Sequence, residues 1–286
     1  MIRQTIAIIH NIEKKLDELR NHVRRCPLLQ RVTAVEYSRE VGSGKSRPAL
    51  IVAQSESGEF VELVAKFAES CERKEIALAV EVIGACLAGD LGLPVPEPLI
   101  VELPVEWLAV LPKDYRSVAG NAAFAFGSKL VSGQWPHWSQ TSKLSETMVQ
   151  TAASIFAFDA LIDNVDRRNE NPNCLVSGNQ IRIFDHEMAW TQKLFASKPW
   201  QLGSLRDFAN PGNHIFRNEL LSCVIDFEAI KENWLNLNDE KIAGYGAAVP
   251  VEWANDKGTI TRILTEISEV RNNIDACFVE IERVLQ

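Results

Sequence analysis

The sequence predicts an α+β protein in two parts, a small β-rich part over residues 29–132 and a larger, mainly helical part over residues 133–286, preceded by an added helix over residues 1–28. Three observations predict this division. Short apolar runs separated by glycine turns surround one embedded helix in the first part. Helical periodicity dominates the second part. Since no long glycine- or serine-rich linker separates them, we expect a short hinge near residues 131–133.

The first part is expected to contain a meander of strands over residues 31–39, 47–54 and 60–67. Glycine-containing turns lie between these runs. A helix is expected over residues 72–91, because a glycine and then two prolines follow it, as is typical of a helix end. The chain then returns to strand over residues 98–103 and 122–131.

The second part is expected to begin with a helix from about residue 145 to residue 164, followed by a hairpin that ends at Asp185. Helical patterns dominate again from about residue 226. Apolar stripes with three- and four-residue spacing cover residues 2–23 and 263–284. Both stripes are long enough for a helix, and we expect them to pack on the body or on each other rather than form coiled coils.

Composition excludes several classes of partner. The formal net charge of -8 argues against a general nucleic-acid or anionic-membrane surface. The six cysteines show no zinc-ligand spacing and are expected to be buried thiols in a reducing compartment. The first residues suit neither a secretion signal nor a membrane span. We therefore expect a cytoplasmic protein with no membrane association.

An acid, an amide and a second acid follow one another in an order that indicates phosphoryl transfer. Asp166 precedes Asn171 by five positions, and Asp185 ends an apolar strand. Asp166 is predicted to accept or orient an acceptor hydroxyl, while Asn171 and Asp185 are predicted to bind Mg²⁺ through oxygen. Arg167 or Arg168 is predicted to steady the transferred charge. The alternative is a simple polar turn, which the hairpin leading to Asp185 makes less favoured.

Lys66 ends an apolar strand and is predicted to contact the nucleotide phosphates. Such a lysine needs an acidic partner from the next helix. Glu75 and Glu81 are both candidates, and Glu81 is preferred by its helix face. The alternative for either glutamate is a solvated helix face.

A glycine-containing turn over residues 42–46 is the candidate flap over the nucleotide. It is similar to a P-loop, but that motif requires glycine where Arg39 stands, and a helix after it rather than a strand. We expect a flap whose backbone amides and Lys45 cover phosphates, with an ordinary hairpin loop as the alternative. The expected nucleotide-binding residues are Lys66, Glu81, Gly42, Ser43, Gly44, Lys45, Ser46 and, at the hinge, Val131.

Together these motifs resemble the HipA-like kinases, specifically the shorter branch with a lone kinase domain. The likeness covers residues 40–190 in the family's order and rests on Gly44-Lys45-Ser46-Arg47-Pro48, Lys66, Leu91-Gly92-Leu93-Pro94-Val95-Pro96-Glu97-Pro98, Phe126-Gly127-Ser128, Asn164-Val165-Asp166-Arg167, Asn171-Pro172-Asn173 and Asp185-His186. It implies a bilobal protein-kinase-like fold and an ATP- and Mg²⁺-dependent kinase. Lys66 would then contact phosphates, Asp166 would be the catalytic base, and Asn171 and Asp185 would hold the metal. The segment 166–171 is also similar to the catalytic loop of phosphatidylinositol kinases.

The chain departs from the kinase pattern at Glu187, where many kinases have glycine, and it lacks a clear activation segment after Trp190. No chemistry is assigned to His186. The resemblance implies a Ser/Thr protein kinase, such as a toxin or a defence component, but not an antitoxin partner. Autophosphorylation at Ser43 or Ser46 is a weaker hypothesis that follows from the same resemblance.

Three functional hypotheses remain open. A Ser/Thr kinase is preferred over a kinase for a small-molecule or lipid hydroxyl, and the acidic composition weighs against the lipid. The third reading is a nucleotide-binding pseudokinase that acts as an interaction module. A regulatory partner or a homodimer that binds through the terminal helices is a further hypothesis.

Overall fold

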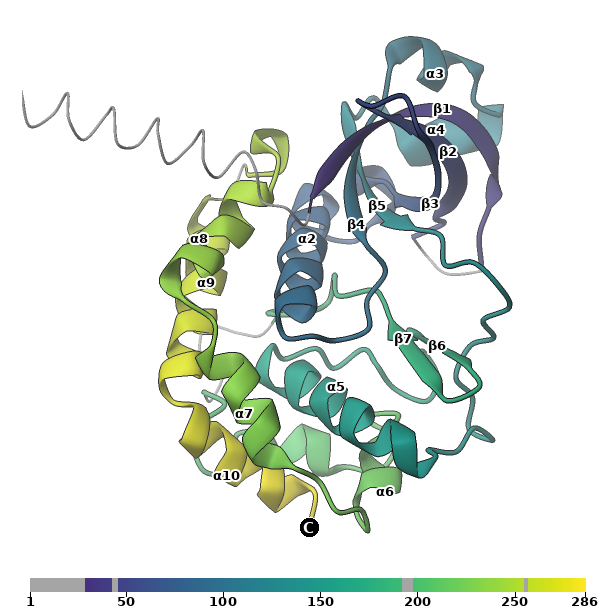
Figure 1. Ribbon diagram of the computed structural model, residues 1–286. Helices are drawn as coiled ribbons and strands as arrows, with labels where there is room; N and C mark the ends of the chain where they lie inside the picture. Colours follow the sequence, from purple (N-terminus) through teal and green to yellow (C-terminus); the bar gives the residue numbers. More distant parts are fainter. Residues whose placement is uncertain (1–28, 43–45, 192–197, 255–256) are drawn as a thin grey trace, which may run out of the picture.

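The computed structural model describes residues 29–42, 46–191, 198–254 and 257–286 and shows a mixed α+β fold (Figure 1). A β-barrel lies at one end of the molecule, and helices make up most of the other end. The helix expected over residues 1–28 lies outside the described residues. The predicted boundary between residues 132 and 133 stays a prediction.

Within the described residues, five strands close into a barrel in the order β1-β2-β3-β5-β4. Their bounds are β1 (Gln30–Glu40), β2 (Ala49–Ser55), β3 (Phe60–Lys66), β4 (Pro98–Glu102) and β5 (Phe124–Lys129). Each expected strand is present, and β1, β2 and β3 form the expected meander of antiparallel neighbours. The barrel closes because β1 also pairs with β4 in parallel, with Val32 opposite Val101. No turn sequence specifies a pairing between strands so far apart in the chain.

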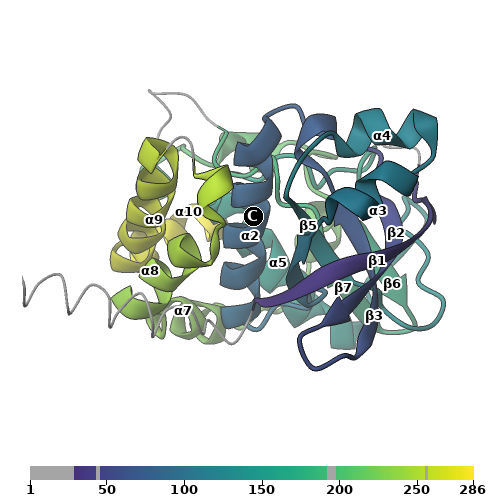
Figure 2. The same cartoon turned by 90° about the horizontal axis from the view of Figure 1, so that it is seen from above.

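Helix α2 (Lys74–Asp90) packs between the barrel and the helices α8 (Asp239–Ala248) and α9 (Lys257–Asn272), as Figures 1 and 2 both show. Its residues from Ala77 to Ala88 are all buried. A helix that is apolar on all sides is typically enclosed by other elements. It ends before Gly92, whose φ of 73° places it in the left-handed region that terminates helices.

Two short helices cover the barrel on the side away from α2, and the sequence did not reveal them (Figure 2). They are α3 (Val105–Val110) and α4 (Lys113–Ala119), and each follows a proline in extended conformation. Trp107 and Tyr115 anchor them in the core of the barrel. Six or seven residues are too few for a helical period to be recognised.

The helical end is built around α5 (Val149–Leu161), which follows the turn η2 (Glu146–Met148). The hairpin β6 (Cys174–Ser177) and β7 (Gln180–Ile183) lies between α5 and the barrel (Figure 1). The remaining elements are η1 (Ala68–Ser70), η3 (Arg206–Ala209), α6 (Arg217–Leu220), α7 (Phe227–Leu235), η4 (Val251–Trp253) and α10 (Ile274–Val284). Asp226 and Asn238 cap the amino ends of α7 and α8 with their side chains.

The apolar stripe predicted over residues 263–284 packs on the body, as expected. It is divided between α9 and α10, which meet at Asn273. Ile263, Ile267, Cys277 and Ile281 are each 1% exposed or less. A coiled coil would require this face to be free for a partner, and it is not. No helix in the described part of the chain is both long and apolar enough to cross a membrane.

Candidate active site

Lys66, at the end of β3, places its ammonium among three carboxylates. Its Nζ lies 2.7 Å from Oδ1 of Asp185, 3.1 Å from Oε2 of Glu187 and 4.0 Å from Oε1 of Glu81. The residue is 8% exposed. Burial disfavours the charge, but Asp185, Glu81 and Glu187 outweigh it and raise the pKa of Lys66 well above its usual range. A charged ammonium therefore sits between the barrel and the segment after β7 that carries Asp185.

Glu81 is the carboxylate that α2 brings to this cluster, whereas Glu75 lies in the first turn of the helix. Oε2 of Glu81 accepts a hydrogen bond from the backbone N–H of His186 at 2.5 Å. Burial raises the pKa of Glu81 to about 7, and Lys66 opposes that rise. Glu81 thus ties α2 both to Lys66 and to the segment after β7.

Glu187 is a site residue that sequence reasoning treated only as a departure from the kinase pattern. Its Oε2 accepts hydrogen bonds from the Lys66 ammonium and, at 3.5 Å, from the thiol of Cys71. Burial and then Glu187 raise the pKa of the Cys71 thiol far above its usual range. Alternation along a strand could not have revealed Glu187, because β7 ends at Ile183 and Asp185 has a φ of 64°.

Asp166 lies on the loop after α5 and is oriented by two amides. Its Oδ2 accepts hydrogen bonds from Nδ2 of Asn171 at 2.6 Å and from Nδ2 of Asn173 at 3.3 Å. Burial, followed by the nearby charge of Asp185, raises the pKa of Asp166. The structure thus brings Asp166, Asn171 and Asp185 to one place, and it adds Asn173, to which the sequence analysis gave no role.

Arg167 does not face this site, which corrects the expectation that it steadies the transferred charge. Its side chain is fully buried, and its Nε lies 2.6 Å from Oδ2 of Asp159. Its Nη1 donates to the backbone carbonyls of Asn173 and Phe184. Arg167 therefore fixes the loop of Asp166 to the segment that leads into Asp185. Arg168 is the arginine beside the site, with Nη2 3.9 Å from Oδ1 of Asp166.

Asp159, on α5, organises a buried polar network that sequence reasoning missed. It accepts hydrogen bonds from Arg167 and from Nδ2 of Asn164 at 2.8 Å, and its Oδ2 lies 3.1 Å from Nε2 of His214. Burial opposes ionisation, but Arg167 and His214 hold the pKa of Asp159 well below its usual range. An aspartate on the apolar face of a helix was the sequence signal for a buried polar network. Its partner His214 lies 55 positions away and could not be found from a local pattern.

His186 packs as an uncharged ring. Its Cβ faces Gly84 of α2, and its ring meets Phe158 edge to face at 5.6 Å. Neither ring nitrogen has a hydrogen-bond partner among the described residues. Burial lowers the pKa of His186 to about 3. The ring therefore holds α2 and α5 against the segment of Asp185 and carries no charge.

The sequence pattern that defines the HipA-like kinase family matches residues 64–280 of this chain. The chain belongs to the HipA-like kinase family. The matched region contains Lys66, Asp166, Asn171 and Asp185 together. Curated proteins give no match. Among solved structures, the chain is similar to the Helicobacter pylori proinflammatory kinase CtkA, with 13% sequence identity, a TM-score of 0.40, and coverage of 82% of this chain and 96% of that chain.

The donor atoms of this HipA-like kinase fit a magnesium ion that arrives with a nucleotide. Asn171 donates to Asp166 through its amide nitrogen, so its amide oxygen is left for a cation, and Asp185 supplies a carboxylate. In the described part of the chain, no three His, Cys, Asp or Glu side chains are grouped to hold a metal by themselves. Mg²⁺ usually takes one or two protein oxygens and completes its shell with water and substrate phosphates.

The candidate flap is fixed at its base. Arg47 donates two hydrogen bonds to the carboxylate of Glu40, at 2.8 Å and 2.7 Å, and its carbonyl accepts from the Tyr115 hydroxyl at 2.6 Å. Gly42 and Ser46 flank the turn, while residues 43–45, which include the predicted Ser43, Gly44 and Lys45, lie outside the described residues. Val131 follows β5 in the connection towards the helical end.

Proposed function

We propose that this HipA-like kinase transfers the γ-phosphate of ATP, in the presence of Mg²⁺, to the hydroxyl of a serine or threonine in a protein. The observation that supports this most is the convergence of Lys66 from β3, Asp166 after α5 and Asp185 after β7. Phosphoryl transfer depends mainly on positioning and electrostatic stabilisation, which these groups supply. We also propose a bilobal arrangement, with the barrel and α2 as the lobe that covers the nucleotide.

In the proposed mechanism, Lys66 exchanges its contact with Asp185 for the phosphates of the nucleotide and neutralises part of their charge. Asn171 and Asp185 would hold a magnesium ion, which would supply positive charge against the phosphates. Asp166 accepts the proton of the acceptor hydroxyl at one of its carboxylate oxygens. Its hydrogen bonds from Asn171 and Asn173 hold that carboxylate in place, so little reorganisation is needed at the moment of transfer.

Arg167 and Asp159 position the loop of Asp166 and take no part in the chemistry themselves. The ion pair between them is fully buried, and Arg167 also holds the carbonyls of Asn173 and Phe184. The loop of Asp166 and the residue before Asp185 therefore cannot move apart without breaking a hydrogen bond from Arg167, and the buried ion pair, which is costly to break, holds Arg167 on α5. This network maintains the distance between the proposed base and the proposed metal ligand.

Calorimetric titration with ATP tests the nucleotide part of this proposal. Wild-type protein is expected to bind ATP more tightly with Mg²⁺ than with EDTA. Asp185→Asn removes a ligand carboxylate and should abolish that difference. Asp275→Asn, at a 92% exposed side chain at the start of α10, is the matched control and should bind as wild type does. ATP binding that is unaffected by both Mg²⁺ and Asp185→Asn would refute the proposed metal site.

A further inference from the structure

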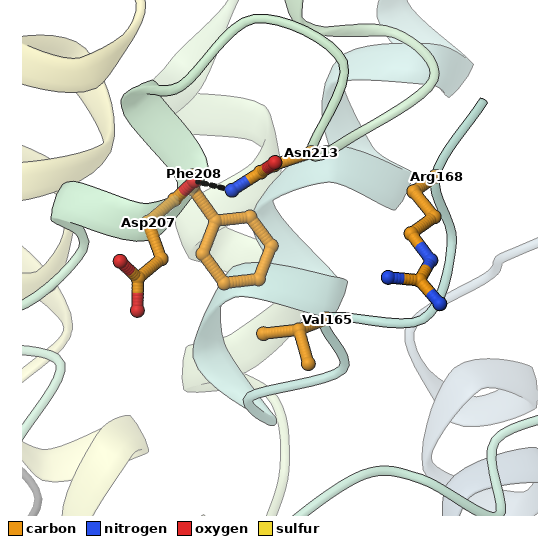
Figure 3. A pocket seen from close by; sticks show the side chains of 5 residues that line it. All are labelled: Val165, Arg168, Asp207, Phe208 and Asn213. Atoms are coloured by element: carbon orange, nitrogen blue, oxygen red, sulfur yellow. Dashed lines mark hydrogen bonds between the residues drawn. The ribbon is translucent and has the colours of Figure 1, made fainter. Parts of the chain in front are cut away.

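A pocket of about 230 Å³ opens beside the loop of Asp166 (Figure 3). Residues from two segments line it. Val165 and Arg168 belong to the loop, Asp207 and Phe208 belong to η3, and Asn213 belongs to the connection between η3 and α6. Figure 3 shows the ring of Phe208 in the middle, with Arg168 and Asp207 on opposite sides. None of these five residues has a role in the nucleotide site proposed above.

The two walls of the pocket are joined to each other and to the loop of the proposed base. The backbone N–H of Asn169 donates to the carbonyl of Gly212 at 3.4 Å, and that of Ile215 donates to the carbonyl of Arg167 at 3.2 Å. Nδ2 of Asn213 donates to the backbone carbonyl of Asp207 at 2.9 Å. A group held in this pocket is therefore fixed relative to Asp166, the residue directly after Val165.

The volume of the pocket limits its occupant. Sites for drug-sized ligands usually enclose roughly 300–1,000 Å³. The pocket is smaller than this range, and it suits a single side chain better than a whole cofactor or lipid. Its lining is mixed: Val165, which is 38% exposed, and the buried Phe208 supply the apolar part, and Arg168, Asp207 and Asn213 supply the polar part. An apolar side chain fits the apolar part of this lining.

The two charged side chains at the rim, Arg168 and Asp207, differ in whether they have an ion-pair partner. The guanidinium of Arg168 already lies near a carboxylate, with its Nη2 3.9 Å from Oδ1 of Asp166. The carboxylate of Asp207 has no ion pair among the described residues, and Arg206, its neighbour in η3, does not pair with it. Asp207 is exposed at the mouth of the pocket. The unpaired charge at this rim is therefore negative and favours a cation on the occupant.

We propose that this pocket binds the acceptor polypeptide, with an apolar side chain close to the phosphorylated serine or threonine between Val165 and Phe208, and a lysine or arginine of the same segment beside Asp207. The proposal rests on the proposed protein kinase function and specifies its acceptor. The apolar side chain sets the register of the segment so that the hydroxyl reaches Asp166. Asp207 and Val165 are specificity residues that take no part in the chemistry.

Positional-scanning peptide libraries, with serine or threonine fixed and one flanking position varied at a time, test the proposal with radiolabelled ATP and Mg²⁺. Wild-type enzyme should select an apolar residue at one position and lysine or arginine at another. Asp207→Lys should reverse the second preference towards acidic residues, by about fivefold, since an exposed ion pair changes the ratio by a few fold. Glu240→Lys, at an exposed position of α8, is the matched control and should leave both preferences unchanged.

Val165→Thr tests the apolar wall with little change of shape. It should weaken the preference for an apolar residue by about fourfold, the effect expected for about one methyl-sized apolar contact, and leave the preference at the basic position intact. Wild-type phosphorylation of the peptides without any preference, or preferences that Asp207→Lys and Val165→Thr both leave unchanged, would overturn the pocket assignment while leaving the kinase function standing. Absence of transfer to every peptide and protein would overturn both proposals.

Discussion

The ammonium of Lys66 lies closer to Glu187 than to the glutamate of α2: Nζ is 3.1 Å from Oε2 of Glu187 and 4.0 Å from Oε1 of Glu81. Kinases typically hold this lysine with a glutamate from the helix that corresponds to α2. Here Glu81 also accepts a hydrogen bond from the backbone N–H of His186. Glu187 accepts a hydrogen bond from Lys66 and none from the backbone of the described residues. Glu187 is therefore the nearer glutamate partner of Lys66.

Glu187→Gln is expected to reduce kcat/KM for ATP by about tenfold, because a hydrogen bond to a charged group contributes about 1.5–3 kcal/mol and Lys66 keeps its other carboxylates. Most of the loss should be in KM. Glu81→Gln serves as the comparison and should cost less than about threefold, since its 4.0 Å contact is longer. Steady-state kinetics at fixed Mg²⁺ measures both. A larger loss for Glu81→Gln than for Glu187→Gln would contradict this assignment.

Two glycines of α2 provide a paired test of how His186 is positioned. A Cβ added at Gly84 would lie 2.7 Å from Cβ of His186, whereas one added at Gly89 would meet nothing within 4 Å. Gly84→Ala should therefore displace His186, lowering both thermal stability and activity, because Asp185 is the preceding residue. Gly89→Ala should raise stability by up to about 1 kcal/mol, as alanine usually does within a helix. Equal melting temperatures for the two variants would refute the close packing.

Asp159→Asn should destabilise the protein by about 3–5 kcal/mol, because it leaves the buried Arg167 without a compensating charge. Urea unfolding at neutral pH measures the change. The control is Glu228→Gln, which removes the partner of Lys231 at a side chain that is 83% exposed, and little change is expected there. A loss for Asp159→Asn no greater than that for Glu228→Gln would show that the buried pair does not stabilise the loop.

Glu81 should make stability fall as pH rises towards neutrality. Its pKa is about 7 in the folded protein, against an ordinary value of 4.5. Between these values the folded state keeps a proton that the unfolded state releases, so the stabilisation is complete below pH 4.5 and is lost as pH rises through 7. Each unit of pKa corresponds to about 1.4 kcal/mol, which limits the effect to about 3 kcal/mol.

Urea unfolding of wild type and Glu81→Gln across this pH range isolates the contribution of Glu81. The difference in unfolding free energy between the two proteins should change with pH in the direction just given, because glutamine does not titrate. Groups outside the cluster around Lys66, such as Asp159, titrate equally in both proteins and cancel in the difference. A difference that stays constant with pH would show that Glu81 ionises at an ordinary pKa.

The sequence revealed the local elements of the fold better than the way they join. Strands, α2 and the hairpin before Asp185 were predictable because alternation, helical period and glycine turns act over a few residues. Closure of the barrel was not predictable, since it depends on β1 pairing with β4 across about seventy positions. The short helices α3 and α4 were missed because their helical character depends on Trp107 and Tyr115 packing into the barrel.

In the candidate site, too, local patterns were predictable and contacts between distant segments were not. That Lys66, Asp166, Asn171 and Asp185 lie together was predictable from their residue types and order, and their roles in transfer stay a prediction. Arg167 was misassigned because its position beside Asp166 gave no indication that the side chain points inward to Asp159. His214 and Glu187 were missed because their roles depend on three-dimensional neighbours rather than on a local pattern.

Asp166 is proposed to serve phosphoryl transfer to a hydroxyl of a protein. Purified protein incubated with γ-labelled ATP and Mg²⁺, alone and with cell lysate, tests it against Asp166→Asn. Wild type should place label on serine or threonine. Asp166→Asn should transfer at least about 100-fold more slowly, the contribution of general-base catalysis, while it retains Mg²⁺-dependent ATP binding. Transfer that proceeds equally well with Asp166→Asn, or ATP binding by wild type with no transfer to any protein, would contradict it.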